Sequence, residues 1–263
     1  METSGLLTDR FGRVHDYLRV SLTDRCNFRC VYCMPEHGVA WKPRDEILTF
    51  EEIEHLVRFF VRHGVRKVRL TGGEPTVRHG YLDLVARLAG IPGLESLALT
   101  TNGSLLARDA SELKQRGLAT LNVSLDTLRD DRFEQITRRP GLSNVLRGIA
   151  AALDAGLATK VNVVPLPGIN DDEILDFVEW ARTTPLTIRF IEFMPFLENN
   201  WKPERVITSV EIRRRVAEKY DLLPVSAEPA DVAREYTIDG FAGRLGVISR
   251  VSESFCAGCS RLR

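Results

Sequence analysis

Residues 17–33 read YLRVSLTDRCNFRCVYC, a short apolar strand pattern followed closely by three cysteines. Tyr17 to Thr23 is rich in β-branched and apolar residues and too short for a helix, so it predicts a strand. Cys26, Cys30 and Cys33 then lie in the loop at the carboxyl end of that strand. Parallel α/β folds form their active sites at this end, so the segment indicates a functional loop on an α/β scaffold.

Five further strand patterns follow along the chain, and amphipathic segments separate them. The spacing between successive strands is mostly close to the ~30 residues of a strand–helix–strand unit. One intervening helix is predicted to start at a capping box, formed by Thr49 and Glu52, and to end at Gly64. The five expected strands are KVRLTG (67–72), SLALTTN (96–102), TLNVSLD (120–126), TKVNVVPLP (159–167) and TIRFIEFM (187–194).

Six such units predict a parallel sheet with right-handed crossovers. Because six is fewer than the eight units of a closed barrel, we expect an α/β fold that is a partial, TIM-like (βα)6 barrel. The periodicity also allows a doubly wound sheet, and only the placement of the motifs favours the barrel. We predict a barrel core over residues 1–195 and a small C-terminal α+β region over residues 196–263, where the regular alternation stops.

The composition excludes several classes of protein. Lysine and arginine together number 36, as do aspartate and glutamate, so the formal net charge is zero. A general nucleic-acid or membrane-surface binder carries a basic excess, and we therefore expect neither partner. No apolar run of membrane-spanning length and no signal-peptide core is present, which predicts a cytoplasmic protein. Five cysteines in a reducing compartment argue against a disulfide framework.

Three cysteines within eight positions can bring their thiolates to one metal centre. A zinc site needs a fourth ligand, and the nearest histidine is His37, so zinc stays an alternative. An iron–sulfur cluster usually takes four cysteines, and one held by three keeps an iron open for a substrate or cofactor. Three unrelated buried thiols are a further alternative. The residues alone leave these alternatives open.

Five basic residues lie on or beside the expected strands: Arg19, Lys67, Arg69, Lys160 and Arg189. An unpaired buried cation is costly, so each needs an anionic partner. Pairing with aspartate or glutamate would explain a single one of them. Five cations directed into one barrel instead favour a polyphosphate, because arginine offers two parallel donors to such groups.

The Cys-x3-Cys-x2-Cys spacing resembles the signature of the radical S-adenosylmethionine superfamily. More narrowly, eight motifs in order resemble the GTP 3′,8-cyclase family of molybdenum cofactor biosynthesis. The resemblance runs from about Arg10 to the last residue. The motifs are TDRCNFRCVYCMP (23–35), TGGEP (71–75), TTNG (100–103), NVSLD (122–126), KVNVV (160–164), GINDDEI (168–174), RFIEFMP (189–195) and SFCAGCSRLR (254–263).

The resemblance implies that Cys26, Cys30 and Cys33 hold a [4Fe–4S] cluster whose open iron chelates S-adenosylmethionine. An electron from the cluster then cleaves the cofactor to a 5′-deoxyadenosyl radical. The resemblance further implies Glu74 as a partner of the cofactor's ammonium group. It also gives four residues that contact S-adenosylmethionine: Tyr32, Gly73, Ser124 and Met194.

By the same resemblance, GTP is the substrate and a second [4Fe–4S] cluster lies beside its purine. The family holds that cluster with three cysteines, whereas Cys256 and Cys259 are the last two in this sequence, which ends at Arg263. We therefore expect the sequence to correspond to a truncated cyclase with an incomplete second cluster. The implied GTP-binding residues are Arg19, Arg69, Thr100, Lys160, Arg261 and Arg263.

The function that the resemblance implies is a lyase reaction, the conversion of GTP to (8S)-3′,8-cyclo-7,8-dihydroguanosine 5′-triphosphate. No catalytic side chain beyond the cofactor ligands is predicted. A reductant protein is the expected partner, and a homodimer is open. Two rival functions stand beside it: a radical enzyme that acts on a peptide, and a non-catalytic metal-binding domain.

Overall fold

Ten strands form one sheet in the computed structural model, which describes residues 7–35, 37–195, 199, 201–225, 231–253 and 258–262. The strand order is β10-β1-β2-β3-β4-β5-β6-β9-β8-β7. The bounds are β1 (Tyr17–Ser21), β2 (Lys67–Thr71), β3 (Ser96–Thr101), β4 (Thr120–Ser124), β5 (Ala158–Val163), β6 (Thr187–Ile191), β7 (Leu223–Pro224), β8 (Arg234–Thr237), β9 (Arg244–Ile248) and β10 (Arg261–Leu262).

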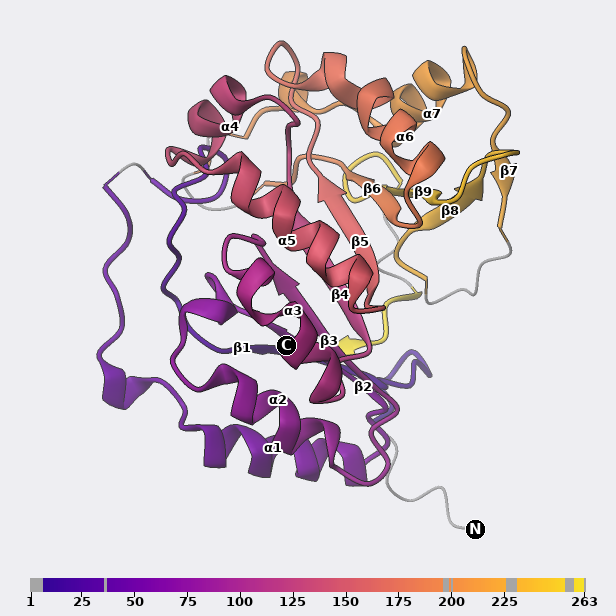
Figure 1. The fold of residues 1–263 in the computed structure, drawn as a ribbon. Helices are drawn as coiled ribbons and strands as arrows, with labels where there is room; N and C mark the ends of the chain where they lie inside the picture. Colours follow the sequence, from indigo (N-terminus) through magenta and orange to yellow (C-terminus); the bar gives the residue numbers. More distant parts are fainter. Residues whose placement is uncertain are drawn as a thin grey trace.

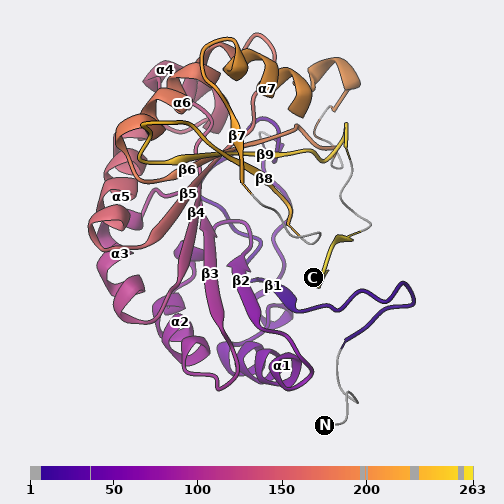
Figure 2. The same ribbon diagram turned by 90° about the vertical axis from the view of Figure 1, so that its right-hand side faces the viewer.

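Strands β1 to β6 are parallel and adjacent in chain order, and helices cover the outer face of the curved sheet (Figure 1; Figure 2). This arrangement is the predicted partial barrel. Each of these six strands ends one to four residues before its predicted end, and β1 ends at Ser21 rather than Thr23. The helices are α1 (Phe50–Arg62), α2 (Tyr81–Ala89), α3 (Leu106–Gln115), α4 (Asp130–Thr137), α5 (Leu142–Asp154), α6 (Ile174–Thr183) and α7 (Ser209–Ala217).

Residues after the sixth strand extend the same sheet at both edges. Strand β9 pairs in parallel with β6, and β10 pairs in parallel with β1, where Arg261 lies opposite Tyr17. The last described residues therefore return to the first strand, as both views show (Figure 1; Figure 2). The boundary after residue 195 stays a prediction. Within the described residues, no helix has the length and apolarity that crossing a membrane requires.

The two faces of each strand have opposite chemistry, as strand β2 illustrates. Val68 and Leu70 are fully buried beneath the helices, whereas Lys67, Arg69 and Thr71 line the inner side of the barrel. Successive side chains of a strand point to opposite faces, so one strand supplies both an apolar outer layer and a polar inner one. The packed core thus lies between sheet and helices, and the inner face is left for a ligand.

Helix α1 begins at the predicted capping box. The Thr49 side chain accepts a hydrogen bond from Glu52 N at 3.2 Å, and the Glu52 carboxylate accepts one from Thr49 N at 2.7 Å. Gly64 follows the helix with φ of 98°, a conformation that glycine adopts at low cost.

We expect Thr49→Ala to lower the free energy of unfolding by about 1 kcal/mol, because helix α1 loses an N-cap acceptor. Denaturant titration of the protein measures this loss. Thr49→Ser keeps the acceptor and is the matched control. An unchanged midpoint for Thr49→Ala would contradict a stabilising role for the cap.

Candidate active site

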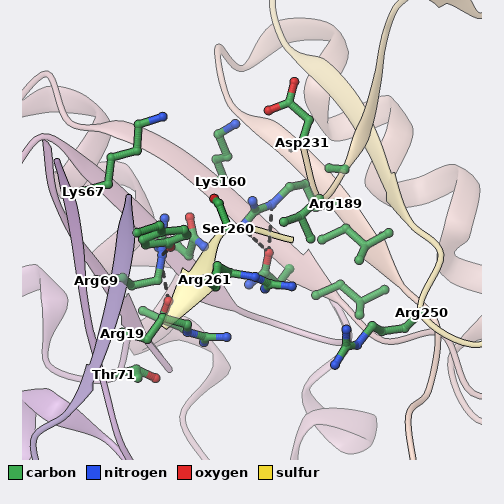
Figure 3. A pocket seen from close by; sticks show the side chains of 18 of the residues that line it. Arg19, Lys67, Arg69, Thr71, Lys160, Arg189, Asp231, Arg250, Ser260 and Arg261 are labelled. Carbon is green, nitrogen blue, oxygen red and sulfur yellow. Dashed lines mark hydrogen bonds between the residues drawn. The ribbon is translucent and has the colours of Figure 1, made fainter. Parts of the chain in front are cut away.

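A cavity of about 1110 Å³ occupies the inside of the partial barrel. Residues from all six parallel strands line it, together with segments that follow β6 and precede β10. Figure 3 shows Arg19, Lys67 and Arg69 entering this space from one side and Lys160 and Arg189 from the other. The structure therefore brings the five basic residues singled out in the sequence into a single cavity.

The cavity carries an excess of positive charge. Seven arginines and lysines line it, against three carboxylates, which come from Asp16, Asp231 and Glu235. Burial, together with the nearby charge of Arg69, lowers the pKa of Arg189 to about 10. Arg189 still carries its charge at neutral pH, so the cavity is suited to an anionic ligand.

Neighbouring strands hold the cations in fixed positions. Arg69 donates from Nε to the Tyr17 hydroxyl and from Nη1 to Thr100 Oγ1 at 3.3 Å. Arg189 donates to Asn162 Oδ1 from Nε at 3.0 Å and from Nη2 at 2.7 Å. Because these partners are neutral, both guanidinium groups keep a full charge available to a ligand.

Lys160 differs from these arginines because a carboxylate neutralises it. Its Nζ lies 2.7 Å from Glu235 Oε1, and both side chains are less than one-third exposed. Glu235 comes from β8, which the antiparallel pairing with β9 brings to this side of the barrel. An anionic ligand that binds Lys160 must therefore compete with an internal carboxylate.

The cysteine loop follows β1 and is anchored to the end of helix α4. Arg29 N donates to Thr137 O and Val31 N donates to Ile136 O, both at 2.9 Å. Arg138 donates to two carbonyls of the same loop. Since α4 follows β4, the loop crosses from the first strand to the far side of the barrel mouth.

The three thiols of this loop fit a four-iron cluster. Burial raises the pKa of Cys30 well above its ordinary value, and the charges of Asp126, Cys33 and Cys26 raise it further. The thiols thus lie close enough to repel one another as thiolates, and a bound cationic cluster would relieve that repulsion. Among the residues that the structure describes, no three metal-binding side chains converge on a single ion, so the zinc alternative has no preformed site. Each thiolate of a cluster binds a different iron and needs no such convergence.

The TGGEP turn packs against the start of the cysteine loop. A Cβ atom at Gly73 would come within 2.3 Å of Arg25 O, and one at Gly72 within 2.5 Å of Thr23 O. Only glycine permits this approach. Gly73 N donates to Thr23 O at 2.7 Å, so this N–H group already has a partner in the protein.

Glu74 forms hydrogen bonds within the protein in addition to the role that the resemblance implies. The side chain is buried, and its carboxylate accepts hydrogen bonds from Thr76 N, Thr76 Oγ1, Thr101 Oγ1 and Asn102 N. Burial raises the pKa of Glu74, while these donors lower it. The carboxylate therefore ties the ends of β2 and β3 together, and its role with the ammonium group stays a prediction.

The other residues predicted to contact S-adenosylmethionine lie at strand ends. Met194 follows β6 and lines the cavity. Ser124 ends β4 two residues beyond the cavity residue Asn122 and hence on the same face of the strand. Tyr32 lies in the cysteine loop, half-buried. The structure thus gathers these residues around one end of the barrel.

The second cysteine site lies at the opposite end. Arg261 lines the cavity beside the amino end of β1, and its Nε donates to Cys259 Sγ at 3.2 Å. Burial raises the pKa of Cys259, but the hydrogen bond and charge of Arg261 leave it below the ordinary value. Cys256 and Arg263 lie outside the described residues.

Of the remaining predicted GTP-binding residues, Arg19, Arg69, Thr100 and Lys160 all line the cavity. Sequence reasoning missed Glu235, Asp231 and Arg250, which also line it. Their part of the chain gave only short strand-like patterns, with no sign of which strands they join. Asp126 closes the NVSLD motif but received no role, although it contacts the cysteine loop.

The sequence matches two families that divide the chain. Residues 20–181 match the Radical SAM superfamily, and residues 186–263 match the family described as Molybdenum Cofactor Synthesis C. The GTP 3′,8-cyclase of Alkaliphilus metalliredigens is 43% identical over 259 residues, which are 98% of this chain and 80% of that protein. The chain belongs to the GTP 3′,8-cyclase family of the radical SAM superfamily.

Eukaryotic relatives of the cyclase family are equally similar. "Molybdenum cofactor biosynthesis protein 1" of Drosophila melanogaster is 48% identical over 98% of this chain and 46% of that relative. "GTP 3',8-cyclase, mitochondrial" of Arabidopsis thaliana is 46% identical over 99% of this chain and 67% of that relative. The chain thus spans about half the length of the Drosophila relative.

Solved structures support the fold. Streptococcus suis SuiB superposes with a TM-score of 0.63 at 16% identity, covering 80% of this chain and 47% of SuiB. Methylornithine synthase superposes with a TM-score of 0.61 at 16% identity, over 78% of this chain and 62% of that one. Membership of the radical SAM superfamily identifies a [4Fe–4S] cluster and S-adenosylmethionine as the cofactors.

Proposed function

We propose that the protein converts GTP to (8S)-3′,8-cyclo-7,8-dihydroguanosine 5′-triphosphate in molybdenum cofactor biosynthesis. The observation that carries this proposal is a cationic cavity that extends between two cysteine sites. Cys26, Cys30 and Cys33 follow the carboxyl end of β1, while Cys259 precedes the strand that pairs with its amino end. A nucleoside triphosphate bound between them lies with one end near each site.

The chain's own residues bind and orient the substrate. Arg19, Arg69 and Lys160 hold the triphosphate through charge-assisted contacts, and Thr100 adds a hydroxyl. Arg261 lies beside Cys259, where we place the purine, and the family resemblance adds Arg263 as a further contact. The fixed partners of Arg69 mean that little reorganisation is needed when GTP enters.

The cluster and S-adenosylmethionine, when bound, supply a carbon radical that removes a hydrogen atom. In the substrate, the C3′–H bond breaks and a bond forms between C3′ and C8 of guanine. The C8–N7 double bond becomes single, and N7 takes up one electron and one proton. A one-electron reductant, which we expect to be a protein, supplies the electron. The product is therefore an isomer of GTP.

Anaerobic incubation with GTP, S-adenosylmethionine and a chemical reductant tests the proposal. Chromatography with mass spectrometry should find a nucleotide that has the mass of GTP and a different retention time. Omitting S-adenosylmethionine should abolish it. Formation of 5′-deoxyadenosine that does not depend on GTP, with no such isomer, would contradict the proposal.

Replacing Glu235 should strengthen GTP binding, whereas replacing a residue that binds GTP should weaken it. Glu235→Gln removes the carboxylate that pairs with Lys160, so GTP no longer competes with it. We expect GTP to bind roughly threefold to tenfold more tightly, a gain of about 0.7–1.4 kcal/mol. Equilibrium binding at two salt concentrations measures this change, which salt should reduce. Weaker GTP binding by Glu235→Gln would show that the carboxylate instead helps to hold the nucleotide.

A further inference from the structure

A buried carboxylate on the far side of the barrel mouth holds the cysteine loop through a tyrosine. The Tyr32 hydroxyl donates to Asp126 Oδ2 at 2.5 Å. Tyr32 belongs to the loop that follows β1, whereas Asp126 lies just beyond β4. The hydrogen bond therefore crosses the opening between two strands that are not neighbours in the sheet.

Asp126 is itself fixed by groups outside the cysteine loop. Its Oδ1 accepts from Val164 N at 2.8 Å, and its backbone carbonyl accepts from Asn170 Nδ2 at 2.6 Å. Asn170 Oδ1 in turn accepts from Leu166 N at 2.7 Å. Asp126 is buried, so it forms a rigid acceptor built on the ends of β4 and β5.

Tyr32 lies between loop residues that the end of α4 holds, because Arg138 also donates to Met34 O at 3.3 Å. Arg29 and Val31 are bound through their backbones to the end of α4. In the following turn, Cys33 N donates to Cys30 O at 2.9 Å. The Tyr32 side chain links this turn to Asp126. The Tyr32 ring also packs edge-on against buried Phe193, with centroids 6.3 Å apart.

We propose that Asp126 is a positioning residue for S-adenosylmethionine, acting through the Tyr32 hydroxyl. The hydrogen bond fixes the Cys30–Cys33 turn relative to β4, which bears the predicted cofactor contact Ser124. The cysteine loop and Ser124 are therefore already in place relative to each other before the cofactor binds. This inference rests on the proposed function only in taking S-adenosylmethionine as the ligand of the cysteine loop.

The test uses Tyr32→Phe, Asp126→Asn and the double variant in protein reconstituted anaerobically with iron and sulfide. The iron and sulfide content should match that of the unchanged protein, because the three thiols remain. The dissociation constant for S-adenosylmethionine should rise about tenfold in each single variant, as expected when one charge-assisted hydrogen bond is lost. The double variant should be no weaker than either single one, since both remove the same contact.

A matched control is available in a second buried tyrosine–aspartate pair. The Tyr81 hydroxyl donates to Asp109 Oδ2 at 2.7 Å, and both residues lie on the outer helices α2 and α3. Tyr81→Phe should lower stability and leave cofactor affinity unchanged. The electron paramagnetic resonance spectrum of the reduced cluster gives a second measurement. At a concentration that saturates the unchanged protein, S-adenosylmethionine should shift the Tyr32→Phe spectrum only partly.

Two results would overturn the inference. One is unchanged S-adenosylmethionine affinity in both Tyr32→Phe and Asp126→Asn. The other is an equal loss in Tyr81→Phe, which would mean that any loss of stability weakens binding. These results are distinct from failure of the proposed function, because cofactor affinity and the spectrum are measured without GTP. A protein that binds S-adenosylmethionine through this pair but forms no cyclised nucleotide would leave the inference standing.

Discussion

We expect replacement of Cys30 by alanine to abolish cleavage of S-adenosylmethionine and to remove the oxygen-sensitive iron–sulfur cluster from the cysteine loop. Cys30 shares this loop with Cys26 and Cys33, and only three cysteines are available there. Two thiolates leave two irons of the cluster without protein ligands, so the cluster becomes labile or does not form. Iron and sulfide analysis, with quantification of 5′-deoxyadenosine, measures both effects.

The matched control is Cys259→Ala at the other end of the barrel. This variant keeps the three thiols after β1 and should still form 5′-deoxyadenosine. It should lose the cyclised nucleotide, because Cys259 lies where we place the purine. Full 5′-deoxyadenosine formation by Cys30→Ala would contradict the assignment of the cysteine loop to the cluster.

We expect Lys160→Ala to weaken GTP binding by roughly tenfold to a hundredfold and guanosine binding far less. A charge-assisted contact contributes about 1.5–3 kcal/mol, which corresponds to that range. The substitution also leaves Glu235 without its lysine partner inside the cavity, where its charge repels a triphosphate. Arg69→Ala should act in the same direction. Isothermal titration with each ligand makes the comparison.

Two further variants separate the causes. Lys160→Ala combined with Glu235→Gln should recover part of the lost affinity, because the repelling carboxylate is gone. Lys114→Ala removes a lysine from the outer helix α3, where its Nζ donates to Gly156 O, and should leave GTP affinity unchanged. Equal losses for GTP and guanosine in Lys160→Ala would show that this lysine does not bind the triphosphate.

The barrel and the position of the cysteine loop could be predicted because both depend on local sequence. The strand patterns placed Arg69 and Lys160 on expected strands, and the structure directs both into the cavity. Cys26 was expected beyond the carboxyl end of the first strand, and it follows β1. The period of the apolar side chains and the spacing of the strands are both set within segments of about 30 residues, so they can be recognised in the sequence.

The contacts across the barrel could not be predicted from the sequence, because they join residues that are distant in the chain. Arg261 pairs with Tyr17 through a strand of two residues, which has no periodicity to detect. Glu235 reaches Lys160 only because β8 folds back on β9. Asp126 was visible within NVSLD, but its partner Tyr32 lies 94 positions away. Such pairs are set by the topology of the whole sheet.

Transfer of deuterium from GTP labelled at C3′ tests the proposed function most directly. The protein, reduced anaerobically with S-adenosylmethionine, should yield 5′-deoxyadenosine that carries a single deuterium, and a GTP isomer that lacks it. GTP labelled at C2′ should give unlabelled 5′-deoxyadenosine. If the label at C3′ stays in the nucleotide while 5′-deoxyadenosine accumulates, the reaction does not begin at C3′ of GTP, and the proposed function is wrong.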